Sequence, residues 1–253
     1  MSSHIQSLAR ELNCDARSIG VSGRRGFMLV PRINPGSKLY PWLWYAPTFL
    51  ANLPNRSHLW LFRHFLAKGM VIAGIDIGES FGSPEGRAIY ADFHDRICRD
   101  FGLAQKACLF AQSRGGLMLY NWAVEHPDDV ACIAAVYPAC DLRSYPGLDR
   151  AARAYSMSLE DLQRHLPDHN PVDRLAALAK SNVPIRHIHG NADTIVPLAA
   201  NTVEVASRYK ALNGEMDFFV VADKGHEVLP DYFERRELVD FVFQRGLLRI
   251  HWL

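Results

Sequence analysis

KACLFAQSRGG, residues 106–116, is the stretch that decides the fold of this chain. Its first half is an apolar run typical of a buried strand, and a small-x-Ser-x-Gly turn then leads into an expected helix. Such a turn is sterically crowded, so the residues two before and two after the serine must be small, as Ala111 and Gly115 are. The pattern predicts a nucleophile elbow that lifts the Ser113 hydroxyl above a sheet edge and leaves the Arg114 amide facing a reacting oxygen.

Two later turns carry the partners that a serine nucleophile needs. PIRHIHGNADTIVP, residues 184–197, predicts a short strand that ends in a polar turn carrying Asp193. Residues 216–222 form another apolar run, and the loop that follows holds His226. Because the carboxyl ends of parallel strands share one edge of a sheet, Ser113, Asp193 and His226 are expected to converge there. His187 and His189 alternate within the first of these strands and are interpreted as core residues.

Alternating strand and helix patterns predict an α/β fold, a mostly parallel sheet with helices on both faces. Apolar runs predict further strands at 26–31, 39–46, 70–75, 106–110 and 131–137. Helical spacing and capping residues predict helices at 57–68, 88–101, 114–125, 198–212 and 230–244. The longest interval between strands, 138–182, is expected to form a short helical insertion after the sixth strand that caps the pocket or packs beside it.

With these motifs, the chain resembles the α/β-hydrolase superfamily from about residue 21 to residue 245. The run HGNADTIVP at 189–197 is most similar to the acid turn of prolyl oligopeptidase-like and acetyl-xylan-esterase-like serine hydrolases. The resemblance implies a catalytic triad of Ser113 as nucleophile, Asp193 as acid and His226 as base. Two departures are that Ala111 replaces the usual first glycine of the elbow and that no His-Gly-Gly-Gly oxyanion motif occurs.

Composition is that of one globular enzyme domain spanning 1–253, with residues 1–20 as an N-terminal extension. The chain is 49% hydrophobic, which suffices for a large core. Lys and Arg total 28 against 27 Asp and Glu, so the charge favours neither nucleic acid nor an anionic membrane as a partner. Five cysteines without paired spacing indicate reduced thiols and a cytoplasmic location. Homo-oligomerisation is left open.

The oxyanion hole is expected to combine the Arg114 amide with one from the loop after strand 39–46. Pro47 has no N–H, so Thr48 is the first choice, with Phe49 and Tyr45 as alternatives. Asp141 also follows a predicted strand and is the alternative acid. No metal or cofactor is expected, because neither the His187/His189 pair nor the His165/His169 pair has an obvious third ligand.

Aromatic and charged residues flank the expected site and suggest how substrate binds. Phe49, Glu79 and Tyr137 are the candidate substrate-binding residues. Further aromatic side chains, more often core than binding platform, are Trp42, Trp44 and Tyr45 on the oxyanion side and Phe81 in the loop 78–84.

These residues favour a cofactor-free serine hydrolase that cleaves carboxylic esters, with acyl groups on carbohydrates, acetyl or aryl, as one substrate class. The alternatives are a prolyl oligopeptidase-like peptidase or amidase, and a non-catalytic binding protein on the same fold. A large gating domain is expected of the peptidase, and its absence from these residues favours the esterase. A lyase that uses the same triad is a further alternative.

Overall fold

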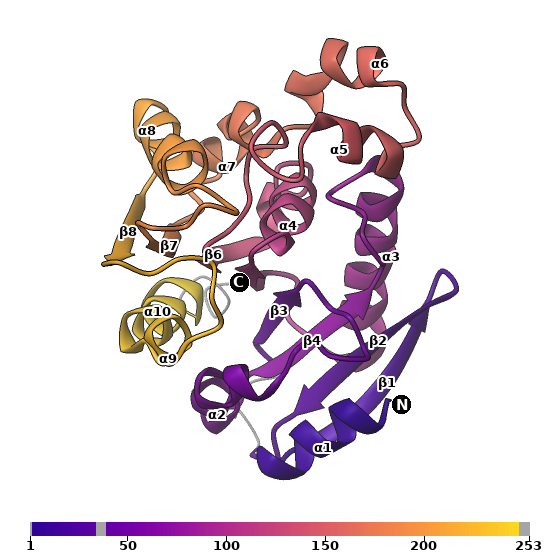
Figure 1. Ribbon diagram of the computed structural model, residues 1–253. Coiled ribbons are helices and arrows are strands. Elements are labelled where there is room, and N and C mark those ends of the chain that lie inside the picture. Colours follow the sequence, from indigo (N-terminus) through magenta and orange to yellow (C-terminus); the bar gives the residue numbers. More distant parts are fainter. Residues whose placement is uncertain (1, 34–38, 248–253) are drawn as a thin grey trace.

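A computed structural model describes residues 2–33 and 39–247 of the chain. Their centre is an eight-stranded sheet with the strand order β1-β2-β4-β3-β5-β6-β7-β8 (Figure 1). The first two strands pair antiparallel, as do β2 and β4, and every later pair is parallel. The strands are β1 Asp15–Val21, β2 Arg24–Val30, β3 Trp42–Ala46, β4 Val71–Asp76, β5 Ala107–Gln112, β6 Val130–Val136, β7 Ile185–Gly190 and β8 Met216–Val221. The predicted α/β class is confirmed.

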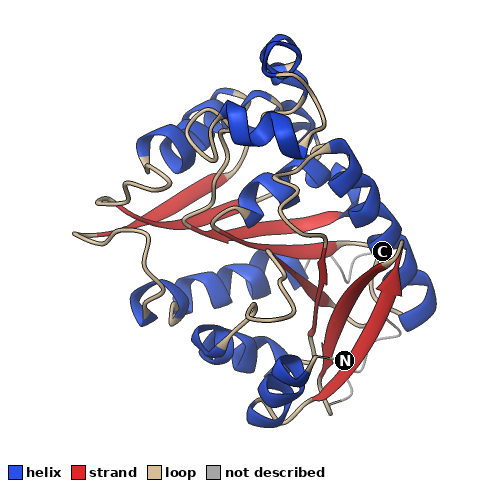
Figure 2. Ribbon diagram, turned by 45° about the vertical axis from the view of Figure 1, so that its right-hand side comes forward, coloured by secondary structure: helices blue, strands red, loops and turns tan. Residues whose placement is uncertain are grey.

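Helices cover both faces of the sheet (Figure 2). One face carries α3 Pro84–Phe101, α4 Gly115–Ala123 and α8 Glu204–Ala211. The other face carries α1 Ser3–Glu11, α2 Leu59–Ala67, α9 Pro230–Phe233 and α10 Arg236–Phe241. The short turns are η1 Arg56–His58 and η2 Pro127–Asp129, and two π-helical turns are η5 Ala199–Val203 and η6 Val242–Leu247. In the described part of the chain, no helix has both the length and the apolar character needed to traverse a bilayer.

The insertion at 138–182 is helical and packs over α3 and α4 (Figure 1). A separate apolar cluster joins it to the rest of the domain through Phe81, Leu117 and Val196. The Tyr155 hydroxyl donates to the carbonyl oxygen of Phe81 at 3.1 Å. Its helical segments are α5 Leu148–Ala154, α6 Leu159–Arg164, η3 Leu166–Asp168, η4 Pro171–Asp173 and α7 Ala176–Lys180.

Two elements begin at other residues than the sequence predicted, because a proline or a capping residue fixes where each one starts. Strand β3 begins at Trp42, not at residue 39, because Pro41 cannot donate to a neighbouring strand. Helix α3 begins at Pro84 rather than residue 88, since the Ser83 hydroxyl accepts the Gly86 amide and Pro84 occupies the first helical position. The helix expected at 230–244 is divided into α9, α10 and η6.

The N-terminal residues are part of the fold rather than an appended extension. Helix α1 buries Ile5, Leu8 and Ala9 against the second face of the sheet. The next segment is β1, which pairs along its whole length with β2. The sequence predicted neither element, because β1 alternates weakly and exposes four of its seven residues.

Truncation in α1 should therefore destabilise the whole domain. Leu8→Ala removes a side chain that is 2% exposed, and we expect the free energy of unfolding to fall by about 2–5 kcal/mol. Arg10→Ala on the exposed face of the same helix is the control and should change it by less than about 0.5 kcal/mol. Urea unfolding followed by circular dichroism measures both, and equal effects would contradict the role given to α1.

Candidate active site

The turn after β5 has the strained geometry of a nucleophile elbow. Ser113 has φ +51°, in the left-handed region that residues with a Cβ seldom adopt. Its amide donates to Val136 of β6, and its carbonyl oxygen accepts the amides of Gly116 and Ala139. A Cβ on Gly115 would collide with the Ala46 carbonyl, so glycine lets the elbow pack directly against the exit of β3.

The structure brings together the three residues that the sequence predicted to converge. Ser113 Oγ lies 2.7 Å from His226 Nε2, and His226 Nδ1 lies 2.7 Å from Asp193 Oδ2. Since the Asp193 carboxylate is an acceptor, Nδ1 carries the proton and Nε2 is free to accept from the serine hydroxyl. This is the tautomer that a general base requires.

Asp193 is fixed by donors on both carboxylate oxygens. Its Oδ1 accepts the backbone amides of Ile195 and Val196 at 2.9 and 2.8 Å. Burial opposes ionisation, but the donors from His189, His226 and the Val196 amide outweigh it and hold the Asp193 pKa well below its usual range. The carboxylate is therefore charged throughout the neutral range.

The loops that carry Asp193 and His226 are joined to each other. Asn191 Oδ1 accepts the Asp223 amide at 2.7 Å, and the Ala192 amide donates to Lys224 at 3.0 Å. A Cβ on Gly190 would collide with Lys224 and with the Tyr232 hydroxyl, which itself donates to Gly225 at 2.6 Å. These supporting residues were not predicted from the sequence, although the His-Gly pair before the acid turn is a signal for Gly190.

Asp141, the alternative acid, lies in a different network. Its carboxylate accepts from the Arg143 guanidinium at 3.2 Å and from the Asn170 side-chain amide at 3.0 Å. These partners hold the start of the insertion, and the imidazole of His226 is bonded to Asp193 instead.

One expected oxyanion donor, Arg114, lies in the elbow, and the other, Thr48, follows the exit of β3 against which Gly115 packs. Among the described residues, the amides of Arg114 and Thr48 have no hydrogen-bond partner. The Phe49 amide, one alternative, donates to Leu53 at 3.2 Å, and the other, Tyr45, lies inside β3. Thr48 is 2% exposed, and its hydroxyl donates to the Tyr45 carbonyl at 3.2 Å, which anchors this loop beneath the site.

Phe49 and Glu79, two of the candidate substrate-binding residues, meet the side chain of Arg114 beside the elbow. The Arg114 guanidinium forms an ion pair with Glu79 and lies 5.6 Å from the centre of the Phe49 ring. The side chains of Arg114 and Glu79 are 33% and 45% exposed, so they present a charged and aromatic surface to solvent.

Tyr137, a candidate substrate-binding residue, is buried against the His226 imidazole rather than exposed to a substrate. It is 1% exposed, and its ring packs against the His226 imidazole with 4.5 Å between ring centres. Its hydroxyl accepts from Gln112, whose carbonyl oxygen meets His58 Nε2 at 2.9 Å. We therefore assign Tyr137 to supporting the imidazole. Trp42, Trp44 and Phe81 are likewise buried and belong to the core.

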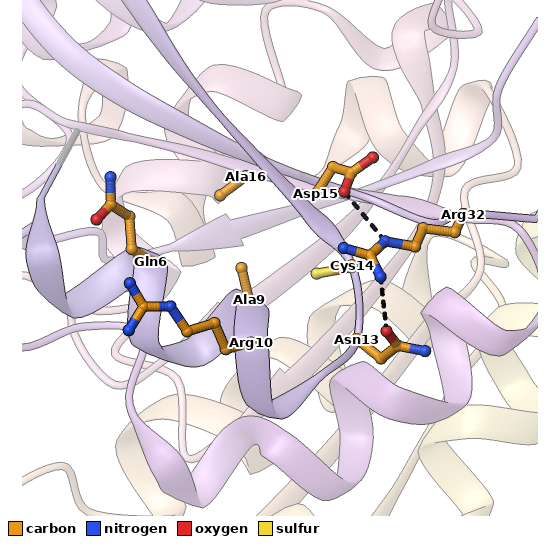
Figure 3. Close-up of a pocket in the computed structure, with 8 residues that line it drawn as sticks. All are labelled: Gln6, Ala9, Arg10, Asn13, Cys14, Asp15, Ala16 and Arg32. Atoms are coloured by element: carbon orange, nitrogen blue, oxygen red, sulfur yellow. Dashed lines mark hydrogen bonds and ion pairs between the residues drawn. The ribbon is translucent and has the colours of Figure 1, made fainter.

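Two other kinds of site, a metal centre and a second pocket, offer little for catalysis among the described residues. No group of three or more His, Cys, Asp or Glu is placed to hold a metal ion in residues 2–33 and 39–247. A pocket of about 550 Å³ lies between α1 and the start of β1, where Arg32 bridges Asp15 and Asn13 (Figure 3). Burial raises the pKa of the Cys14 thiol in that pocket to about 11, which leaves it a weak nucleophile. Three strands separate β1 from β5 and its elbow.

The prolyl oligopeptidase family model matches residues 97–244, which is more than half of the chain. The chain belongs to the prolyl oligopeptidase family. No curated protein matches its sequence.

Solved structures of several α/β-hydrolases are similar to this chain. A puromycin-hydrolyzing peptidase of Mycobacterium tuberculosis has a TM-score of 0.71 and 12% identity over 93% of this chain and 40% of that one. For dipeptidyl peptidase 4 of Porphyromonas gingivalis the TM-score is 0.68 and the identity 16%, over 92% of this chain and 35% of that one. For Est1E from Butyrivibrio proteoclasticus the TM-score is 0.65 and the identity 14%, over 91% of this chain and 98% of that one. The chain thus spans less than half the length of the two peptidases.

Two buried histidines near the site make the domain sensitive to acid. Burial lowers the pKa of His58 to about 4 and that of His187 to about 3. In the unfolded chain they titrate near the ordinary pKa of about 6.5. As the pH falls below that value, the unfolded state gains protons that the folded state does not, so stability is full above about 6.5 and lost towards pH 4.

We expect the free energy of unfolding to be about 2 kcal/mol lower at pH 5 than at pH 7.5 for each of these histidines. Urea unfolding at the two pH values measures the difference. His58→Gln should reduce it, whereas His165→Gln, at an exposed position, should leave it unchanged. A stability that is constant between pH 7.5 and 5 would contradict this account.

Proposed function

We propose that this chain is a serine hydrolase that cleaves carboxylic esters through an acyl-enzyme intermediate. Ser113 is the nucleophile, His226 the general base and Asp193 the acid that orients it. The observation that carries the proposal is the linked pair of 2.7 Å contacts from Ser113 through His226 to a buried, ionised Asp193. A non-catalytic binding protein has no physical need for this arrangement.

In the reaction, His226 Nε2 takes the proton of Ser113 as its oxygen attacks the carbonyl carbon of the substrate. The oxyanion accepts hydrogen bonds from the amides of Arg114 and Thr48. The imidazolium, balanced by Asp193, then protonates the departing alcohol and leaves an acyl group on Ser113. Water, activated by the same imidazole, releases the acid and restores the hydroxyl.

Esters are the first candidate substrates, because the triad described above suffices to cleave them and the alcohol leaves readily. Peptide or amide substrates are the second candidate, favoured by the family match and by the similarity to the two peptidases. Amides have the poorer leaving group, so relative rates on matched esters and amides distinguish the two.

We further propose that the part of the substrate that binds over Arg114, Glu79 and Phe49 is polar and rich in hydroxyls, as in an acylated sugar. A guanidinium and a carboxylate offer both donors and acceptors, and the Phe49 ring offers a flat apolar face. Acetyl and aryl esters of carbohydrates fit this combination.

The test is hydrolysis of p-nitrophenyl acyl esters, acetylated and feruloylated sugars, and aminoacyl amides by the purified chain. We expect ester cleavage, and Ser113→Ala should lower turnover about a millionfold. Activity that survives Ser113→Ala would overturn the mechanism, and faster cleavage of amides would favour the peptidase. Failure of Ser113 to react with a fluorophosphonate would favour the binding protein.

The choice of acid can be tested with a matched pair of variants. Asp193→Asn should lower kcat about 10⁴-fold, because an amide in that place favours the wrong imidazole tautomer. Asp141→Asn changes a carboxylate that bonds Arg143 and Asn170, so its kcat should stay near that of the wild type. Ester turnover of the two folded variants decides between them, and the reverse order would assign the acid to Asp141.

A further inference from the structure

A chain of hydrogen bonds in the apolar core ends beside the Asp193 carboxylate. His189 Nε2 lies 3.4 Å from Asp193 Oδ2, and His189 Nδ1 lies 2.8 Å from Thr202 Oγ1. The same hydroxyl is 2.9 Å from His187 Nδ1, and His187 Nε2 is 2.7 Å from the Tyr120 hydroxyl. These four residues, Tyr120, His187, Thr202 and His189, are all 0% exposed and are called here the buried histidine chain.

The fold brings these side chains together from three elements. His187 and His189 are two residues apart on β7, so both point to the same face of the sheet. Helix α4, which leaves the elbow, supplies Tyr120 on that face, and η5 supplies Thr202. The buried histidine chain thus connects the helix behind the nucleophile to the turn that carries the acid.

Donor and acceptor counting fixes the direction of every bond. His189 Nε2 is 2.8 Å from the Val196 carbonyl oxygen, which can only accept, so Nε2 carries a proton. In a neutral His189, Nδ1 then accepts the Thr202 hydroxyl proton. Thr202 has no second proton, so it accepts from His187 Nδ1, and His187 Nε2 accepts from Tyr120. The donors therefore run from Tyr120 to His189, whose Nε2–H bonds the Val196 carbonyl oxygen and lies 3.4 Å from Asp193 Oδ2.

The two histidines act as neutral rings. Burial, aided by the neighbouring His189, lowers the pKa of His187 to about 3. A cationic His189 would share the single buried carboxylate with the imidazolium that forms on His226, which would leave one buried charge without a counter-charge. The neutral arrangement avoids that cost.

We propose that His189 is a positioning residue for the acid: Thr202, His187 and Tyr120 orient its ring so that Nε2–H bonds the Val196 carbonyl oxygen and lies beside Asp193 Oδ2. This inference rests on the proposed function of Asp193. His189 draws negative charge from Oδ2, the same oxygen that accepts from His226. The buried histidine chain therefore adjusts how strongly the acid favours the protonated imidazole, without touching the substrate.

The other groups around His226 do not supply this effect. Tyr137 packs against the ring, and Tyr232 holds its loop through Gly225. Burial raises the pKa of Tyr137 well above its usual range and that of Tyr232 to about 12, so both stay neutral in the tested range. Glu227 binds the Gly225 amide, and Lys224 lies by Asp231. None of these contacts involves His189 or Thr202.

The experiment compares His189→Leu, which removes the donor, with His189→Gln, whose side-chain amide keeps a donor near the Nε2 position. His226 is titrated by NMR through its imidazole Cε1 resonance, beside the pH profile of kcat/KM for an ester. In His189→Leu the carboxylate retains more charge for the imidazolium. We expect the titration midpoint of His226 and the acidic limb of the profile to rise by about half a unit to one unit. His189→Gln should restore wild-type behaviour.

Thr202→Val, with Thr202→Ser as its control, keeps the proposal falsifiable if His189→Leu fails to fold. Valine breaks the buried histidine chain while His189 remains, so a smaller shift in the same direction is expected. Unchanged His226 midpoints in folded His189→Leu or Thr202→Val would overturn the proposal. So would a loss of kcat at every pH without a shift, which is the mark of a purely structural role. The NMR titration needs no turnover, so an inactive wild type would contradict the proposed function while the midpoints still report on His189.

Discussion

The contact between Ser113 Oγ and His226 Nε2 joins side chains that are 113 residues apart in the sequence, and the geometry around it serves to hold the two atoms at 2.7 Å. A left-handed backbone at Ser113 aims the hydroxyl, and glycine at position 115 lets the turn sit against the end of β3. Strained backbone costs free energy, so the surrounding packing must over-determine it. The backbone hydrogen bonds that Ser113 forms with Val136 of β6 and with Ala139 in the loop after β6 provide that restraint.

The imidazole of His226 lies between two buried polar networks with different origins. Gln112, directly before the nucleophile, links His58 to Tyr137, whose ring supports the imidazole. On the acid side, His189 reaches Asp193 from the core. Buried polar groups are costly unless they are bonded, and a fully bonded network is rigid. One network includes Gln112, directly before Ser113, and the other includes Tyr120 on the helix that leaves the elbow. The geometry of the elbow therefore positions both the nucleophile and the groups around its base.

Sequence reasoning succeeded where a local pattern has one physical cause. Sterics alone require the small residues around Ser113. Burial alone explains the apolar runs of β4 to β8 and the polar turns after them. Sequence reasoning failed at β1, four of whose seven residues are exposed, and at the start of α3, which was expected at residue 88 but begins at Pro84. It also assigned Tyr137 to the substrate, since an aromatic residue after a strand is compatible with either a binding platform or a buried support.

The sequence by itself determined the fold class, the order Ser, Asp, His and the placement of each after a strand, because these depend on short-range periodicity and on the shared edge of a parallel sheet. Only the tertiary structure decided which aspartate faces His226, which amides beside the elbow are without partners, and that His187 and His189 form a directed chain with Thr202 and Tyr120. Those outcomes depend on distances between residues far apart in the chain, and local pattern carries no information about such distances.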